Sequence, residues 1–281
     1  MTELELIVDF HKDAGRQGPG SKRETLRALE FTGLSKSRNL KIADIGCGTG
    51  SHTIHLAQHT QSDIIGVDLF PEFLSKLEKK ATELGLQNRL STLEASMDNL
   101  PFDEEQFDII WSEGAIYNMG FKAGVRDWRR FIKPGGYLCV SEVTWITDQR
   151  PKEIEEFWQR EYSEIDKASN KIRFLEENGF TLAGYFNLTE NSWMKNYYDP
   201  MNARFTPFLE RHNYSDMAER LVQEYRAEIE QYHTYKEFYS YGFYVARKTE
   251  QVDFLIVQSK KKSFIVRGFY TEIGDPGSGP G

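Results

Sequence analysis

The segment Ile42-Ala43-Asp44-Ile45-Gly46-Cys47-Gly48-Thr49-Gly50 constrains this chain more than any other. Its apolar first half is typical of a buried strand. The alternate glycines predict a turn whose backbone can approach a ligand with no Cβ in the way. A second apolar run, Ile64-Ile65-Gly66-Val67-Asp68, ends in a carboxylate placed to accept the hydroxyls of a ribose. Strand, glycine turn, helix, strand and acid together predict an open α/β sheet that binds an adenosine-containing cofactor.

The spacing of the glycines favours one class of cofactor. The dinucleotide fingerprint is G-x-G-x-x-G, whereas here Ser51 follows Gly50 and no glycine stands in that third position. Asp44 would add negative charge beside a pyrophosphate, but it suits a cationic ligand such as the amino group and sulfonium of S-adenosylmethionine. Asp44, Gly46, Gly48 and Gly50 fit the motif D-x-G-x-G-x-G without departure. In this segment the chain resembles the class I S-adenosylmethionine-dependent methyltransferases.

The rest of the chain alternates strands and helices in the order that this resemblance requires. Apolar runs predict strands at about 40–45, 63–68, 89–95, 107–111, 137–143, 180–188 and 240–246. A helix is expected from about Lys122 to Lys133, ended by Pro134-Gly135-Gly136. The β-α-β alternation predicts a parallel, doubly wound sheet. The resemblance implies a Rossmann-like sheet of seven strands in the order 3-2-1-4-5-7-6, with strand seven antiparallel, and a helical cap.

Domain boundaries follow from where this pattern begins and stops. Residues 1–39 are expected to form an N-terminal lid region, in which Ser21 caps a helix that runs to about Phe31. Residues 40–248 are the methyltransferase domain, and the aromatic, helical insert 189–238 is its cap. The tail, 249–281, predicts a hairpin around its lysine run and then a disordered end rich in glycine and proline.

Composition argues against several classes of protein. A net charge of −8 without a long basic tract argues against nucleic-acid binding. No apolar run reaches membrane-spanning length, and acidic residues among the first ten argue against a signal peptide. Cys47 and Cys139 fall in core segments and predict buried thiols, not a disulfide, and hence a cytoplasmic protein. The sequence does not indicate the oligomeric state.

Further segments are expected to complete the cofactor site. Leu69 is placed to pack on the adenine. Residues 95–102 resemble the family segment G-D-x-x-x-L-P-F, which implies that Ser96 or Asp98 reads adenine N6 while the Met97 amide donates to the ring. Arg16 either pairs with the cofactor carboxylate or belongs to a surface turn. The predicted cofactor-binding residues are Arg16, Asp44, Gly46, Cys47, Gly48, Gly50, Asp68, Leu69, Ser96, Met97, Asp98, Glu113 and Gly114.

Candidate catalytic residues follow strands four and five, because ligands of open α/β sheets bind at the carboxyl ends of the strands. Glu113 contacts the methionine end of the cofactor or acts as a base. Glu142 and Tyr117 are further candidates, and so is His233. For Glu142 a purely structural role stays open. Residues 98–102 and 112–115 most resemble the ubiquinone-biosynthesis and nodulation-type small-molecule methyltransferases.

Two other groups of side chains have alternative interpretations. His52, His55 and His59 share one side of a helix, but no cysteine or carboxylate joins them there, so no metal site is expected. Several aromatic residues form either the core of an accessory layer or a cage over the acceptor that favours a cationic amine. These are Trp145, Trp158, Tyr162, Trp193, Tyr197 and Tyr198.

The sequence thus predicts a methyltransferase that uses S-adenosylmethionine to methylate a nitrogen, oxygen or carbon of a small-molecule acceptor. It does not identify the acceptor. Two alternatives stay open. One is a non-catalytic cofactor-binding or regulatory protein. The other is an NAD-dependent oxidoreductase, which the missing glycine after Gly50 opposes.

Overall fold

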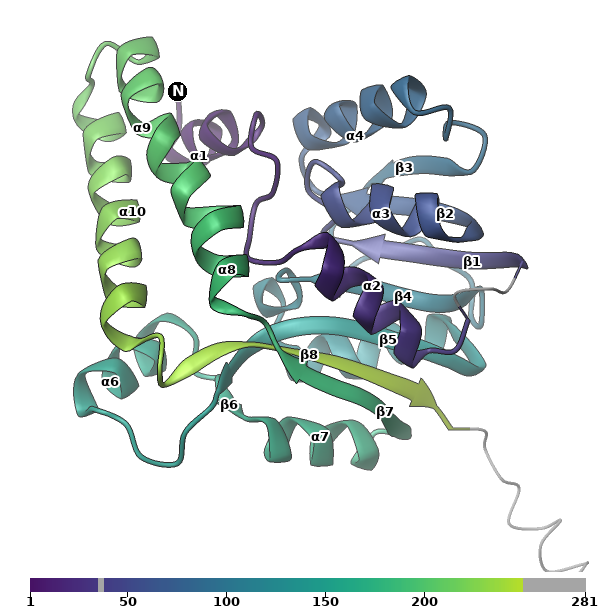
Figure 1. The fold of residues 1–281 in the computed structure, drawn as a ribbon. Coiled ribbons are helices and arrows are strands. Elements are labelled where there is room, and N and C mark those ends of the chain that lie inside the picture. Colours follow the sequence, from purple (N-terminus) through teal and green to yellow (C-terminus); the bar gives the residue numbers. More distant parts are fainter. Residues whose placement is uncertain (35–37, 250–281) are drawn as a thin grey trace, which may run out of the picture. The chain divides into compact units, whose positions relative to one another are not determined.

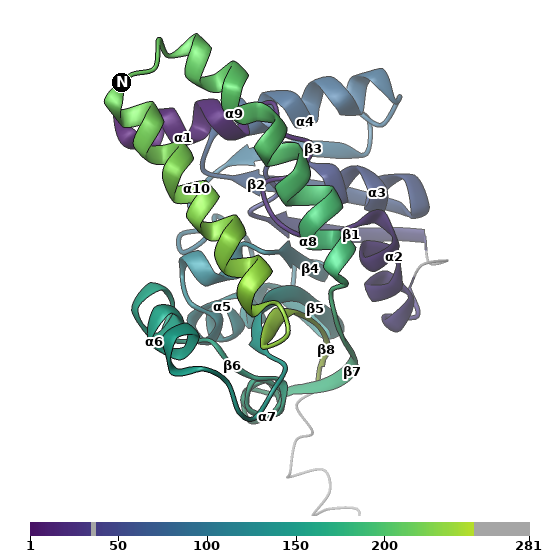
Figure 2. The ribbon, with the colours of Figure 1, turned by 60° about the vertical axis from the view of Figure 1, so that its left-hand side comes forward.

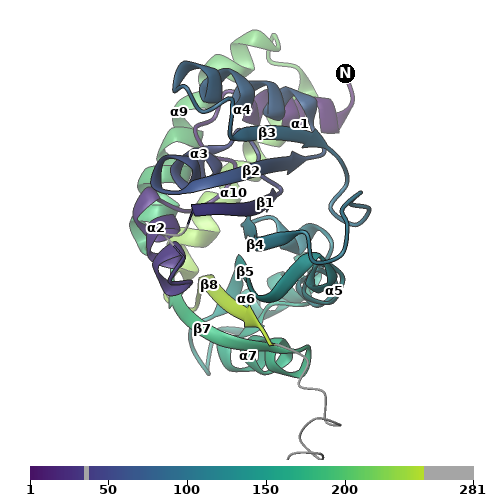
Figure 3. The same ribbon diagram turned by 90° about the vertical axis from the view of Figure 1, so that its right-hand side faces the viewer.

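The computed structural model describes residues 1–34 and 38–249. One mixed sheet lies at its centre, in the order β3-β2-β1-β4-β5-β8-β7 (Figure 3). The short strand β6 pairs with β5. The strands are β1 (Arg38–Ile45), β2 (Gln61–Asp68), β3 (Leu90–Glu94), β4 (Phe107–Glu113), β5 (Ile132–Trp145), β6 (Asp166–Lys167), β7 (Phe180–Asn187) and β8 (Tyr239–Lys248). The predicted order is confirmed, because β7 and β8 occupy the places of predicted strands six and seven.

Strand direction also matches the expectation. β1 pairs in parallel with β2 and β4, β2 with β3, and β4 with β5. β8 runs antiparallel to both of its neighbours, β5 and β7. The carboxyl ends of β1, β2, β4 and β5 therefore meet at one edge, where ligands of such sheets bind.

Helices cover both faces of the sheet and its ligand-binding edge (Figures 1 and 2). They are α1 (Glu3–His11), α2 (Lys22–Phe31), α3 (Ser51–His59), α4 (Pro71–Glu83), α5 (Phe121–Trp128), α6 (Lys152–Glu161), α7 (Ala168–Glu177), α8 (Glu190–Trp193), α9 (Asp199–Arg211) and α10 (Asp216–Tyr235). Short 3-10 turns span Ile116–Asn118 and Arg129–Phe131, and a π-helical turn spans Met194–Tyr198. None of the helices in the described ranges is long and apolar enough to cross a bilayer.

Three apolar cores hold these layers together. One face of the sheet packs against α2, α3 and α4 through residues such as Leu29, Leu56 and Leu77. The other face packs against α5 and α7 through Trp128 and Leu175. The third core joins α1, α6 and the α8–α10 segment to the last residues of β5 and the first residue of β8. The insert 189–238 is thus a helical layer built on the ends of two central strands.

Local differences from the expected elements have physical causes. The helix expected to end at Lys133 is wrong in its second half, because α5 ends at Trp128 and β5 begins at Ile132. Ile132 pairs with Phe107 of β4, and a shift in register after that pair accommodates the Pro-Gly-Gly sequence. Helix α1 was not predicted. Its start is a capping box in which Thr2 and Glu5 bond each other's backbone amides.

Other expectations hold. Ser21 caps α2 by accepting a bond from the Glu24 amide, and α2 ends at Phe31. Cys47 and Cys139 are buried free thiols. The hairpin and disordered end expected within 249–281 lie outside the described residues, apart from Thr249 at the end of the described chain.

The glycine turn depends on backbone conformation and close packing at once. Gly50, the N-cap of α3, has a φ of 81°, and a Cβ on it would overlap the side chain of Leu77 from α4. Gly85, just after α4, has a similar φ of +70°, but nothing lies within 4 Å of the place its Cβ would take. An alanine at Gly85 would thus cause backbone strain alone, whereas an alanine at Gly50 would cause backbone strain and steric overlap.

We expect Gly85→Ala to lower the free energy of unfolding by about 1–2 kcal/mol, the cost of left-handed backbone for a residue with a Cβ. Gly50→Ala should cost a further ~1–3 kcal/mol, because α4 must also move away. Urea unfolding of both variants checks this. Equal losses for the two would show that Leu77 yields without cost and that packing does not restrict this turn.

Candidate functional site

The site begins with the turn between β1 and α3. Amides of Gly46 and Cys47 both donate to the Val67 carbonyl, at 2.8 and 2.9 Å, which ties the turn to the end of β2. The Gly48 amide donates to Asp68 Oδ2 at 2.8 Å. Asp68 Oδ1 accepts from the Phe70 amide, at 3.1 Å. The carboxylate at the end of β2 is thus fixed beside the glycine turn, as its predicted role in binding a ribose requires.

Asp44 lies in the last part of β1 and is completely buried. Its Oδ1 is 3.0 Å from His52 Nε2, and its Oδ2 accepts from the Thr53 hydroxyl at 2.6 Å. Both partners belong to the first turn of α3. Asp44 therefore fixes the start of that helix under the glycine turn, and its predicted contact with a cationic cofactor stays a prediction.

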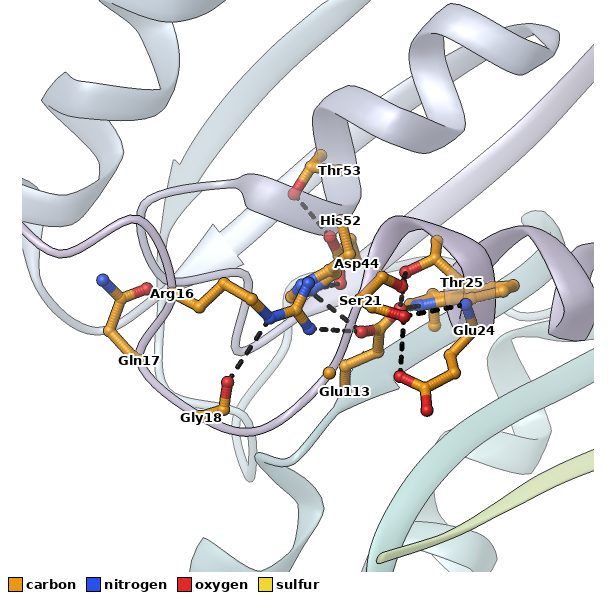
Figure 4. A network of polar contacts seen from close by, with 12 residues as sticks. Arg16, Gln17, Gly18, Ser21, Glu24, Thr25, Asp44, His52, Thr53 and Glu113 are labelled. Atoms are coloured by element: carbon orange, nitrogen blue, oxygen red, sulfur yellow. Dashed lines mark hydrogen bonds and ion pairs between the residues drawn. The ribbon is translucent and has the colours of Figure 1, made fainter. Parts of the chain in front are cut away.

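Glu113, the last residue of β4, connects three parts of the chain (Figure 4). Its Oε2 accepts from Arg16 Nη2 at 2.6 Å, and its Oε1 accepts from the Thr25 hydroxyl at 2.6 Å. Trp111 of the same strand donates its indole N–H to Oε1 at 3.1 Å. Glu113 thus holds the segment before α2, and α2 itself, against the end of β4.

The charges around Glu113 stabilise its ionised form. Burial alone would raise the pKa of Glu113, but His52, 4.0 Å away, and Arg16 lower it below its ordinary value. Burial would lower the pKa of His52, yet the carboxylates of Asp44 and Glu113 raise it. Each group therefore favours the charged form of the other.

Residues 16–17 lie over the glycine turn. Gln17 Oε1 accepts from the Thr49 amide at 2.9 Å, and a Cβ on Gly48 would overlap the Gln17 side chain. Arg16 Nη1 is buried and has no hydrogen-bond partner among residues 1–34 and 38–249. An unpaired buried guanidinium N–H is costly unless an acceptor binds it. This part of the turn fits the carboxylate of an amino-acid cofactor.

The expected adenine side is built from the ends of β2 and β3. Leu69 is 53% exposed, directly after Asp68, and is free to pack on a flat ring. The Met97 carbonyl accepts from the Trp128 indole N–H at 2.9 Å, which fixes the loop after β3. Ser96 is half-buried and Asp98 exposed in that loop. These residues lie at the same edge as the glycine turn, and their contacts with adenine stay predictions.

Glu142 and Tyr117 differ strongly in environment. Glu142 is 1% exposed on β5, and its Oε1 accepts from Lys171 Nζ at 3.3 Å. Its Oε2 is buried and lacks a partner among the described residues. Burial raises the pKa of Glu142, and Lys171 offsets part of that rise. Tyr117 is 43% exposed in the connection after β4. The other candidate base, His233, is exposed on α10.

The three histidines of α3 do not act together. His52 pairs with Asp44, and His59 Nδ1 bonds the His55 carbonyl of its own helix at 2.8 Å. In the described ranges, no group of histidine, cysteine and carboxylate side chains is arranged to hold a metal. Sequence reasoning missed Thr25 and Thr53, whose hydroxyls complete the Glu113 and Asp44 contacts. No local motif marks either residue.

Comparisons with known proteins agree with this geometry. Residues 42–136 match a family model described as a methyltransferase domain. A tocopherol O-methyltransferase of Arabidopsis thaliana is 30% identical over 146 residues, which are 51% of this chain and 40% of that protein. The chain spans 40% to 56% of the length of the first curated relatives it matches.

Two solved structures share the fold. One is a methyltransferase of Geobacter sulfurreducens bound to S-adenosyl-L-homocysteine. It has a TM-score of 0.76 and 15% identity, and the match covers 87% of this chain and 98% of the other. The second is a (4+2)-cyclase, with a TM-score of 0.70, 21% identity and coverage of 88% and 92%. The glycine turn, the sheet order and the methyltransferase-domain match over residues 42–136 together support a class I S-adenosylmethionine-dependent methyltransferase.

Proposed function

We propose that this protein transfers a methyl group from S-adenosylmethionine to a small-molecule acceptor. The observation that carries the proposal is the glycine turn tied to Asp68 on one side and overlaid by the unpaired Arg16 Nη1 on the other. A cofactor with a ribose at one end and an α-carboxylate at the other suits these two groups. The buried free thiols Cys47 and Cys139 suit a reducing compartment, so we also propose a cytoplasmic location.

Each predicted cofactor-binding residue has a place in this proposal. Asp68 binds the ribose diol, Leu69 packs on the adenine, and Ser96, Met97 and Asp98 border it. Gly46, Cys47, Gly48 and Gly50 provide the close backbone approach, and Gly114 and Glu113 border the methionine end with Arg16. Asp44 adds negative potential from beneath the turn. When bound, the cofactor supplies a methyl group on a sulfonium, which is already a good leaving group.

The chain's own contribution is then orientation and exclusion of water. Glu113 is a weak candidate for the base, because both of its oxygens accept bonds and its charged environment lowers its pKa. We propose that it positions Arg16 and α2. Glu142 and Tyr117 remain the candidates for proton removal where the acceptor has a proton to lose.

A second function is a cofactor-binding protein that does not methylate. The (4+2)-cyclase that shares this fold is named for a different reaction. Single-turnover assays with labelled S-adenosylmethionine and pools of small acceptors separate the two. Transfer of label to any acceptor supports the methyltransferase, and cofactor binding without transfer from every pool supports the alternative.

We expect Asp68→Ala to weaken S-adenosylhomocysteine binding by about 2–3 kcal/mol, the scale of bonds to a charged group. Asp63→Ala, on an exposed position of the same strand, is the matched control and should bind as the wild type does. Isothermal titration calorimetry on both variants measures the difference. Wild-type affinity of a folded Asp68→Ala variant would mean that the ribose is held elsewhere.

We expect Glu113→Gln to reduce the dependence of stability on acidic pH. A carboxyl with a lowered pKa in the folded state contributes stability that is present above its unfolded pKa and is lost as pH falls through its folded pKa. The wild type should therefore lose more free energy of unfolding than the variant between pH 6 and pH 3, by urea titration. Glu94→Gln, exposed at the end of β3, is the control. Parallel curves for wild type and Glu113→Gln would contradict the ion-pair role.

We propose that the insert 189–238 is a cap over the cofactor edge and that residues 1–39 form the lid beside it. Gly20 donates its amide to the Ser192 carbonyl, and Asn196 donates to the Gly20 carbonyl at 2.9 Å, so the two segments touch. Hydrogen exchange should show slower exchange in 189–198 when S-adenosylhomocysteine binds. Unchanged exchange there, at saturating ligand, would mean that these helices are accessory core only.

A further inference from the structure

One carboxylate of the proposed cap has no cationic partner in the described part of the chain. Glu228 lies on α10 and is half-buried. Its Oε1 accepts from the Tyr198 hydroxyl at 3.0 Å. No lysine, arginine or histidine nitrogen of residues 1–34 and 38–249 lies within 4.0 Å of it. Glu142, in contrast, is paired with Lys171. A partly desolvated carboxylate without a cation is costly, and a cationic ligand would remove that cost.

The charge of Glu228 acts on tyrosines from four parts of the chain, and the Trp193 ring links three of them, at centroid distances of 6.0 Å to Tyr198, 6.0 Å to Tyr239 and 4.8 Å to Tyr241. Burial and then the charge of Glu228 raise the pKa of five of them, and Glu228 is a lesser contributor for Tyr241. We call the set the acidic tyrosine cluster: Glu228 with Tyr117, Tyr197, Tyr198, Tyr225, Tyr239 and Tyr241. The rings come from the connection after β4, the π-helical turn, α10 and β8. Aromatic faces carry partial negative charge, so they add to the attraction of the carboxylate for a cation.

The acidic tyrosine cluster adjoins the proposed cofactor edge. A Cβ on Gly114 would lie 2.9 Å from the Tyr241 ring, so Tyr241 lies directly against the residue after Glu113. The Tyr241 ring is also 4.8 Å from that of Trp193, in the cap. Tyr117, in the connection after β4, is 43% exposed to water. Tyr117 is thus the exposed member of the cluster, whereas Tyr198 and Tyr239 are buried.

Local backbone geometry supports a ligand-binding role. Tyr197 and Tyr198 lie in the π-helical turn Met194–Tyr198 between α8 and α9. Such turns are rare and occur frequently at functional sites, because the wider turn re-aims its side chains. Here the turn places the Tyr198 hydroxyl on Glu228 and the Tyr197 ring 5.0 Å from that of Tyr198.

We propose that the acceptor carries a cationic amine, either protonated or quaternary, and that the acidic tyrosine cluster binds it through the carboxylate of Glu228 and the surrounding rings. This inference rests on the proposed function, since it assigns the second substrate of the same site. It commits to a positive charge on the acceptor and excludes acceptors whose recognition depends on apolar contacts alone.

The test compares a cation with its neutral isostere. Choline and 3,3-dimethylbutan-1-ol have the same shape, but only choline is charged. We titrate each into the full chain by calorimetry, with and without saturating S-adenosylhomocysteine. We expect choline to bind at least about tenfold more tightly than the alcohol, and Glu228→Gln to remove the difference. The control Glu224→Gln, at an exposed position one turn earlier on α10, should keep it.

A second measurement separates binding from structure. Burial raises the pKa of Glu228 in the folded state. The folded protein therefore loses stability as the pH rises above the unfolded pKa and Glu228 becomes charged. Glu228→Gln should therefore melt no lower than the wild type at pH 8. A lower melting temperature together with unchanged preference for choline would overturn the proposal, and so would equal affinity for the two probes. Absence of S-adenosylhomocysteine binding would refute the methyltransferase function separately. The choline titrations done without S-adenosylhomocysteine would still test whether the acidic tyrosine cluster binds a cation.

Discussion

The bonded carboxylate of Glu113 is the interaction on which the arrangement of this site depends. It ends a buried central strand and receives Arg16 from the N-terminal segment and Thr25 from α2, while His52 of α3 lies 4.0 Å away. Removing one partner of such a group leaves an uncompensated buried charge, which costs about 3–5 kcal/mol. The N-terminal segment, the glycine turn and the end of β4 thus form one electrostatic unit, although they are far apart in sequence.

Side chains from three parts of the chain hold the glycine turn and the start of α3. Asp44 bonds the first turn of α3, Asp68 accepts from the Gly48 amide, and Gln17 accepts from the Thr49 amide. Such preorganisation lowers the entropy lost on binding.

Much of the fold was predictable because its signals are local. Apolar runs, the glycines from Gly46 to Gly50 and the Ser21 cap each identify an element from neighbouring residues. The predicted start of β5 was wrong because Ile132 joins the sheet by pairing with Phe107. Pro134 and the two glycines after it are typical of a turn, so the sequence does not indicate this pairing. The site was predictable as a set of positions, but not as a set of bonds. The bond from Arg16 to Glu113 and the lack of a cation beside Glu228 among the described residues depend on how distant segments pack. No spacing of residues in the sequence indicates either one.

The position of β8 has a consequence for how the chain is assembled. β8 is the last described strand in sequence, yet it lies inside the sheet between β5 and β7. In the described part of the chain β7 pairs with β8 alone, so it cannot join the sheet until residues 239–248 have been synthesised. During translation, β1 to β5 can pair as they emerge, while β7 and the edge of β5 wait through the whole of α8–α10. An unpaired edge of this kind invites association with other chains. The length of the 189–238 insert thus sets how long these edges stay unpaired during synthesis.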